Sequence, residues 1–340
     1  MPHVYADGRK IELTVGKTVF DYADSLKLRV PTSCGRTGEC HECIIEIKQG
    51  HSSLSKPSSS ESFLRDNYRL ACQAYVAESN EDVEFATLRR QPRILTKRSP
   101  RTVQLTPRAT KKNNKVYIED TPVANYTGTI LGLAGDIGTT TVVLNLVDLE
   151  SGSILHTSSF ENPQRFGGSD VMNRISYDSG VFQGELQQAM VSAINFEIGV
   201  MTKTLGLHRR QIFDVVLVGN STMRDILFGI DVQTIGEKPY KSLIQAAYED
   251  KTRKTTAIDI TALSLGLRVS PEAWVYSGPL IGCHIGSDIS ADLLTIGIEN
   301  TLDPIMLVDI GTNTEVVIGN KDGMVAASCP AGPAFEGGQI

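Results

Sequence analysis

Three of the six cysteines in this 340-residue chain lie within ten residues, in the fragment CGRTGECHEC at 34–43. The spacing is Cys34-x5-Cys40-x2-Cys43, and Cys72 follows after a further 28 residues. Three thiolates from one loop and one from a distant position form the usual ligand set of a [2Fe–2S] cluster. The glycines between them allow a loop to bend around the cluster and to point backbone N–H groups at sulfur.

Zinc and a metal-free loop are the alternatives for this cysteine loop. Zinc sites usually combine two separate C-x2-C pairs, whereas here a third cysteine precedes a single pair. The first gap has five residues, one more than the plant-type pattern, so the loop resembles the adrenodoxin-like branch of the ferredoxins. His41 lies between two predicted ligands, and we expect it to face solvent or to support the site, because four thiolates already complete it.

Residues 1–86 are therefore expected to form a β-grasp ferredoxin domain. The alternation around DGR predicts a hairpin, and a helix is expected to begin near Asp21. Strands are predicted in CIIEIKQG at 43–50 and in DVEFATL at 82–88. The segment ESFLRDNYRLACQA at 61–74 is predicted to be a short helix that leads to Cys72.

The cytoplasm is the expected compartment. No stretch approaches the roughly 20 apolar residues of a membrane span, and the start MPHVYADGRK has no apolar run of a signal peptide. Cysteines in the cytoplasm are kept reduced, so a tight cluster favours a metal site over disulfides. We therefore expect no membrane partner.

Residues 87–128 are expected to be a basic linker that contains prolines. The formal net charge of the whole chain is −6, yet ten basic and no acidic residues lie between Arg89 and Lys115. This tract lacks interleaved aromatic residues, so nucleic-acid binding is not favoured. We expect a solvated segment with at most one edge strand, KVYIED, that could dock on an acidic neighbour.

Two similar phrases, DIGTTT at 136–141 and DIGTNT at 309–314, lie 173 residues apart, each between apolar strands. The glycine permits close approach, backbone N–H and threonine hydroxyl groups can hold phosphate oxygens, and the aspartate can bind Mg²⁺. A repeat of this size indicates a duplicated fold. Two purely structural hairpins are the alternative.

These phrases resemble the phosphate-binding hairpins of the actin, Hsp70 and sugar-kinase ATPase superfamily, in which a nucleotide lies between two related halves. Carried over to this chain, the resemblance assigns ATP with Mg²⁺ to Asp136, Gly138, Thr139 and Thr140 in the first hairpin, and to Asp309, Gly311, Thr312 and Thr314 in the second. Gly219, Asn220 and Ser221 end a strand and open a predicted helix, a position that suits an anion.

Residues 129–340 are thus expected to form an incomplete ribonuclease H-like α/β domain of this superfamily. The second hairpin is followed by only 26 residues, whereas the second half of the superfamily fold normally continues further. We expect the chain to be a fragment of a longer protein, and the sequence leaves open whether this fragment itself binds ATP.

The two modules together resemble the reductive activators of corrinoid-dependent methyltransferases. The similar phrases are GLAGDIGTTTVVLNLVDLESG, NPQRFGGSDVMNRI, VVLVGNSTM, SGPLIGCHIGSDISADLL and ASCPAGPAFEGG. The resemblance implies one-electron transfer from the [2Fe–2S] cluster to Co(II) of a corrinoid protein, which restores Co(I). Plant-type clusters lie near about −400 mV and the cobalt couple is expected to lie lower, so ATP would drive the transfer.

The implied partners are a corrinoid protein and an upstream low-potential electron donor; a homodimer is left open. The main alternative function is a ferredoxin-type electron-transfer component whose ATPase-like part is only a docking body. An activator of another enzyme, such as a radical dehydratase, and a sugar or acid kinase with a fused ferredoxin are further alternatives. Cys283 and Cys329 lie among apolar and small residues and are expected to be buried structural thiols.

Overall fold

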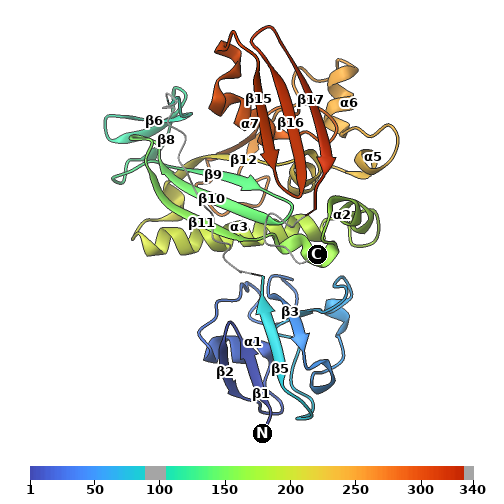
Figure 1. Ribbon diagram of the computed structural model, residues 1–340. Helices are drawn as coiled ribbons and strands as arrows, with labels where there is room; N and C mark the ends of the chain where they lie inside the picture. Colours follow the sequence, from blue (N-terminus) through green and yellow to red (C-terminus); the bar gives the residue numbers. More distant parts are fainter. Residues whose placement is uncertain (89–104, 333–340) are drawn as a thin grey trace.

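The computed structural model describes residues 1–88 and 105–332. Part of the predicted basic linker, residues 89–104, and residues 333–340 lie outside the described residues. Four sheets organise the described part of the chain, and Figure 1 shows their arrangement. No helix in this part is both long and apolar enough to cross a membrane.

The first sheet has five strands in the order β2-β1-β5-β3-β4. These strands are β1 His3–Ala6, β2 Arg9–Glu12, β3 Ile44–Gln49, β4 Tyr68–Leu70 and β5 Val83–Thr87. β1 runs parallel to β5, and every other pair is antiparallel. Helix α1, Val19–Ser25, turns Phe20 and Tyr22 into the core of this domain. The predicted β-grasp ferredoxin fold is confirmed.

Of two local helix predictions in this domain, the one near Asp21 is confirmed and the one at 61–74 was wrong. Helix α1 begins after Thr18, whose hydroxyl accepts a hydrogen bond from the Asp21 N–H while the Asp21 carboxylate accepts one from the Thr18 N–H; this is a capping box. The predicted helix at 61–74 is absent, because Asp66 has a positive φ of 53° and residues 68–70 pair with β3 as strand β4. Between β3 and β4 the chain forms two 3-10 turns, η1 His51–Ser53 and η2 Ser59–Glu61.

Three strands, not one, lie in the described part of the predicted linker. They are β6 Ala109–Lys112, β7 Lys115–Ile118 and β8 Thr121–Asn125. The Arg108 N–H donates to Asp214 at 3.0 Å, and its guanidinium donates to both oxygens of Asp259 at 2.8 and 2.9 Å. Val116 and Ile118 pack in a small core with Phe213. This sheet therefore depends on distant residues, which local periodicity does not reveal.

A six-stranded sheet organises the centre of the second part of the chain, in the order β11-β10-β9-β12-β14-β13. The strands are β9 Leu131–Ile137, β10 Thr141–Asp148, β11 Ile154–Glu161, β12 Ile212–Val218, β13 Ile258–Thr261 and β14 Trp274–Ser277. β9, β10 and β11 form an antiparallel meander, and β12 and β14 run parallel to β9. This is the plan of the ribonuclease H-like fold, so the predicted α/β class is confirmed.

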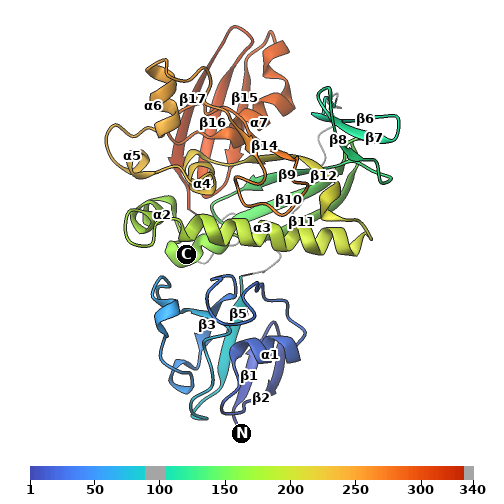
Figure 2. The same ribbon diagram turned by 180° about the vertical axis from the view of Figure 1, so that it is seen from behind.

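Two helices follow β11, α2 Val171–Asp178 and α3 Glu185–Thr204. The break falls at Gly184, which has a φ of 89° and whose N–H donates to the Asp178 carboxylate at 3.1 Å. Figures 1 and 2 show α3 between the six-stranded sheet and the ferredoxin domain. One helix thus contacts both parts of the protein.

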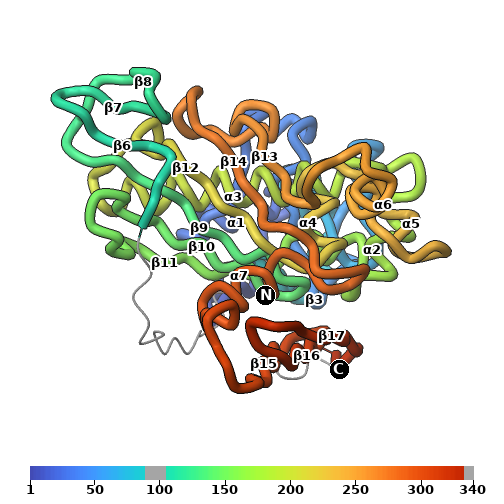
Figure 3. The backbone as a smooth tube through the Cα atoms, turned by 90° about the horizontal axis from the view of Figure 1, so that it is seen from above, coloured from blue at the N-terminus to red at the C-terminus, as the bar shows by residue number. Residues whose placement is uncertain are grey.

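The remaining helices follow the strands of the central sheet. They are α4 Ser221–Leu227, α5 Gln233–Gly236, α6 Leu243–Glu249 and α7 Ser287–Ile296, with 3-10 turns at η3 Pro163–Gly167, η4 Arg209–Gln211 and η5 Ile298–Asn300. β15 Ile305–Ile310, β16 Asn313–Asn320 and β17 Gly323–Pro330 then form a separate antiparallel sheet. Figure 3 shows this sheet standing apart from the central one.

Candidate functional site

The cysteine loop, residues 34–43, leads directly into β3. Several residues in it have positive φ angles, which is costly for side chains other than glycine: Gly35 67°, Arg36 74°, Gly38 91° and His41 54°. The φ of Gly38 would strain any other residue there, and a Cβ would also lie 2.9 Å from the end of the Gln73 side chain. Gln73 in turn donates to the Cys72 sulfur at 3.4 Å. These backbone conformations allow N–H groups of the loop to point toward the cysteine sulfurs.

The four predicted cluster ligands form two pairs. The sulfurs of Cys43 and Cys72 are 3.4 Å apart, and both residues are buried. Cys34 accepts hydrogen bonds from Cys40. Among the described residues no three His, Cys, Asp or Glu side chains converge on one metal position, and a two-iron cluster does not require this, because each iron takes two cysteines. The residues present therefore fit a [2Fe–2S] cluster better than a single zinc ion.

The thiols of this loop are readily ionised at two positions. Burial tends to raise the pKa of Cys34, but hydrogen bonds from Thr37 and Cys40 outweigh it and lower the pKa to about 5. The hydrogen bond from Cys43 lowers the pKa of Cys72 to about 7 and raises that of Cys43. Thiolates are the form that binds iron.

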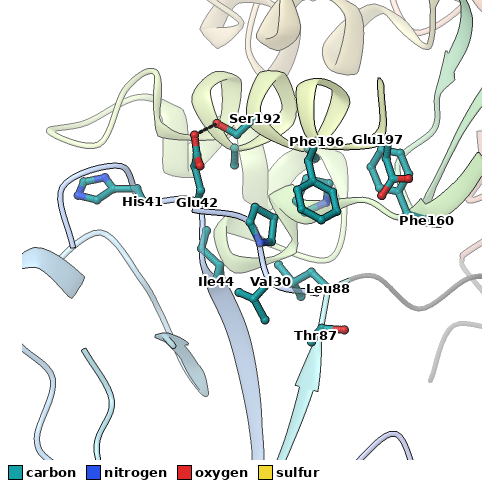
Figure 4. A pocket seen from close by; sticks show the side chains of 14 residues that line it. Val30, His41, Glu42, Ile44, Thr87, Leu88, Phe160, Ser192, Phe196 and Glu197 are labelled. Carbon is teal, nitrogen blue, oxygen red and sulfur yellow. Dashed lines mark hydrogen bonds between the residues drawn. The ribbon is translucent and has the colours of Figure 1, made fainter. Parts of the chain in front are cut away.

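The cysteine loop lies against helix α3. His41 Nδ1 is 2.9 Å from Glu185 Oε2, and Gln188 donates to the Cys40 carbonyl at 3.0 Å. Figure 4 shows Glu42 reaching Ser192 on the same helix, where the two side chains are 3.4 Å apart. As expected, His41 does not join the thiols; it supports the loop from the side of the second domain.

The two DIGTxT hairpins lie tip to tip. Thr140 Oγ1 and Thr312 Oγ1 are 2.8 Å apart and form a hydrogen bond. Ile137 pairs with Val142 in the first hairpin and Ile310 with Thr314 in the second, so the first turn spans residues 138–141 and the second is one residue shorter, at 311–313. A phosphate bound by both turns would replace the direct contact of the two hydroxyl groups.

Other predicted nucleotide residues converge on the first hairpin. Asn220 caps α4 by accepting from the Met223 N–H, and its Nδ2 donates to Thr139 Oγ1 at 3.0 Å. A Cβ on Gly219 would lie 2.8 Å from the Ile137 carbonyl, so only glycine allows this approach. Thr314 is different, because it lies in β16 beyond the turn and Thr312 makes the contact between the hairpins.

Carboxyl groups gather beside the hairpins. Burial, with the nearby charges of Asp136, Glu315 and Asp309, raises the pKa of Asp288 to about 8. Burial and Asp309 likewise raise the pKa of Asp292 to about 6. Such mutual repulsion is relieved by a cation, and carboxylate oxygens are the ligands that Mg²⁺ prefers. Among the described residues no three of these side chains converge on one metal position, so a magnesium ion here would take its remaining ligands from water and from nucleotide phosphates.

Sequence reasoning missed three residues of this site. Asn162 Nδ2 donates to the Gly138 carbonyl at 2.8 Å, and Arg174 Nη2 donates to the Thr139 carbonyl at 2.7 Å. Asp288 lies in the first turn of α7. The acidic pair in GSDISAD, four residues apart on one helix face, was the available signal for Asp288. Asn162 and Arg174 carried none, because only the tertiary fold brings them to the hairpin.

Comparison with known families follows this division of the chain. Residues 4–77 match the 2Fe-2S iron-sulfur cluster binding domain. Residues 131–301, half of the chain, match the RACo middle region, and residues 303–340 match the C-terminal domain of RACo, the ASKHA domain. The chain belongs to the RACo family. The predicted [2Fe–2S] cofactor and the resemblance to reductive activators of corrinoid proteins are thereby confirmed.

Individual relatives agree with this family. The corrinoid activation enzyme RamQ of Eubacterium limosum is 25% identical over 96% of this chain and 60% of its own length. The [Co(II) methylated amine-specific corrinoid protein] reductase of Methanosarcina barkeri is 25% identical over 61% of this chain and 37% of its own. A solved structure, the reductive activator for corrinoid, iron-sulfur protein, matches 99% of this chain and 64% of its own, with a TM-score of 0.63 and 25% identity. The chain thus spans less than two thirds of these relatives.

Proposed function

We propose that this chain, as part of its intact protein, delivers one electron to the cobalt of a corrinoid protein and converts Co(II) to Co(I) under the control of Mg-ATP. One observation carries the proposal: a paired four-cysteine loop and two DIGTxT hairpins that meet through Thr140 and Thr312 occur in one folded chain. The [2Fe–2S] cluster supplies the electron, which it receives from a low-potential donor.

The residues around the cluster have holding and tuning roles in this proposal. Cys34, Cys40, Cys43 and Cys72 would bind the irons. Gln73 donates to the Cys72 sulfur, and such hydrogen bonds stabilise the more negative, reduced form and raise the potential. The Gln188 contact to the Cys40 carbonyl fixes the loop against α3.

The predicted nucleotide residues would hold the phosphates between the six-stranded sheet and the β15–β17 sheet. The turn at Gly138 and Thr139 and the turn at Gly311 and Thr312 offer N–H and hydroxyl groups to phosphate oxygens. Asp136 and Asp309 would orient the magnesium ion or its waters. Because the turns belong to different sheets, a ligand that contacts both would bind differently when the sheets move apart. Such differential affinity is what allows a ligand to shift a conformational balance.

The experiment uses the intact protein, prepared without oxygen, with its cluster reduced. It is mixed with a Co(II) corrinoid protein from the same cell, and Co(I) is followed by absorption with and without Mg-ATP. We expect Co(I) to form only with Mg-ATP. Formation of Co(I) at the same rate without ATP would favour the plain electron-transfer component instead.

Substitution of Asp309 tests the nucleotide half of the proposal. We expect Asp309→Asn to abolish the stimulation by Mg-ATP, because the carboxylate facing the second turn is lost, while the reduced cluster remains intact by absorption. Asp322→Asn is the matched control, since Asp322 is exposed in the turn between β16 and β17. Equal ATP stimulation in the Asp309 variant and the control would contradict the assigned role.

A further inference from the structure

Helix α2 contacts the ferredoxin domain through Tyr177. The Tyr177 hydroxyl donates to the Phe63 backbone carbonyl at 2.5 Å, and the tyrosine is 1% exposed. The Arg65 guanidinium lies 4.7 Å from the centre of the Tyr177 ring. Phe166 bridges the two domains: its ring makes T-shaped contacts with the rings of both Phe63 and Tyr177, with the ring centres 5.6 Å apart in each pair. The contact is therefore buried and specific in geometry.

Phe63 connects this contact with the cluster loop. Its ring stacks on His41 with the ring centres 4.2 Å apart. His41 lies between the predicted ligands Cys40 and Cys43. A displacement of Tyr177 would thus reach the loop through one intervening side chain.

The same helix contacts the first nucleotide hairpin through Arg174. This residue is fully buried, and its Nη2 donates to the Thr139 carbonyl at 2.7 Å while its Nε donates to the Gly168 carbonyl at 3.0 Å. Burial lowers the pKa of Arg174 to about 9, so the group stays charged at neutral pH. The acceptors that it contacts among the described residues are uncharged, with the Asp170 carboxylate acting only from nearby. A buried charge is stabilised further when an anion comes near. Nucleotide phosphates held by Thr139 would be such an anion.

Arg174 and Tyr177 are three residues apart and lie on one face of α2. We infer that α2 couples the nucleotide hairpin to the docking of the ferredoxin domain, with Arg174 responding to bound phosphate and Tyr177 passing the response to Phe63 and the cluster loop. This inference rests on the proposed nucleotide site. Coupling between two sites is reciprocal, so docking must also change nucleotide affinity.

The test measures backbone amide hydrogen exchange in the intact, cluster-loaded protein with and without the magnesium complex of AMPPNP. In the wild type we expect slower exchange at residues 138–140, and a changed rate at 41–43 and 62–66. Tyr177→Phe removes one hydroxyl group and keeps the packing of the ring. It should retain the protection at 138–140 and lose the response at 62–66. Tyr248→Phe is the matched control, because Tyr248 is exposed on α6.

Nucleotide affinity gives an independent readout. The Tyr177→Phe variant should change the dissociation constant for Mg-AMPPNP by about two- to tenfold, the effect of one buried hydrogen bond. The sign is fixed by reciprocity. If the nucleotide speeds exchange at 62–66 in the wild type, the variant must bind it more tightly; if it slows exchange there, the variant must bind it more weakly.

The outcomes separate the two proposals. No protection at 138–140 in the wild type would overturn the nucleotide site and the coupling together. Protection at 138–140 without any response at 62–66 would overturn the coupling alone. A response that survives unchanged in Tyr177→Phe, or a change in affinity of the wrong sign, would also overturn it.

Discussion

The six thiols of the chain have different environments. Four form the two pairs of the cysteine loop, whereas Cys283 is only partly buried and Cys329 is exposed on β17, where its sulfur lies 3.6 Å from the Thr314 carbonyl. The expectation that both remaining thiols are buried was wrong, because the outer face of the β15–β17 sheet is exposed. Spacing singled out the four candidate ligands, but the exposure of the other two thiols depends on what covers each strand.

Cysteine substitution tests the ligand assignment. Cys72→Ser should lose the [2Fe–2S] absorption and electron paramagnetic resonance signals, and most of its iron, because the distant fourth thiolate is removed. Cys283→Ser is the control and should keep both signals and its iron. Unchanged iron content and spectra in Cys72→Ser would exclude Cys72 as a ligand.

Asp288 should make stability depend on pH in a definite direction. Its pKa rises from 3.8 unfolded to about 8 in the folded protein, so between these values the folded state holds a proton that the unfolded state has lost. The free energy of unfolding then decreases as pH rises, by on the order of 1 kcal/mol per pH unit. The measurement is denaturant unfolding at pH 5.5 and 7.5 in EDTA.

The comparison for this measurement is Asp288→Asn, which cannot titrate. The wild type should lose stability relative to the variant as the pH rises. Parallel pH profiles of the two proteins would show that Asp288 ionises normally in the folded state.

The segment before Cys72 illustrates how an element is chosen by tertiary contacts. Glu61 is 2% exposed; its carboxylate accepts from Arg69 Nε at 2.8 Å, from the Leu70 N–H at 2.9 Å and from the Ser58 N–H at 2.7 Å. Burial tends to raise the pKa of Glu61, but hydrogen bonds from Arg69 and two backbone N–H groups outweigh it and lower the pKa. The buried ion pair of Glu61 and Arg69 stabilises β4. The chain therefore reaches Cys72 through a strand, where the sequence analysis predicted a helix.

Glu61→Gln should destabilise the ferredoxin domain by about 3 kcal/mol, because it leaves the buried Arg69 charge without its partner. Unfolding monitored through the cluster absorption measures this, with exposed Glu84→Gln as the control. The contribution of Glu61 should be present above its unfolded pKa of 4.5 and disappear as the pH falls below it. Equal stability of both variants at pH 7 would contradict this account.

Local patterns predicted the elements that local residues determine. The repeated DIGTxT phrase fixed both hairpins, and the apolar strands beside them were visible in the sequence. Of the β6–β8 sheet only β7, in KVYIED, was predicted; β6 and β8 were missed because Arg108 holds the sheet through Asp214 and Asp259, more than 100 residues away. The break between α2 and α3 depends on a single carboxylate, Asp178, which accepts a hydrogen bond from the Gly184 N–H at the turn.

In the molecule as a whole, α3 and the neighbouring segment 162–178 connect the ferredoxin domain with the domain that carries the two DIGTxT hairpins. The ferredoxin domain contacts α3 through the cysteine loop. Asn162 and Arg174 donate hydrogen bonds to backbone carbonyls in the turn between β9 and β10. The sequence allowed both modules to be recognised but gave no sign of this junction. Its residues are far apart in the chain and match no spacing rule.

The most direct measurement of the central claim is a single-turnover reaction of the intact protein. Its cluster is reduced with one electron, all excess reductant is removed, and cluster oxidation and Co(I) formation on a Co(II) corrinoid protein are followed together by stopped-flow absorption. With Mg-ATP, we predict that both signals change at the same rate and in equal amounts, and that neither changes without it. Cluster oxidation without Co(I), or Co(I) formation that is independent of Mg-ATP, would contradict nucleotide-controlled electron transfer to the corrinoid.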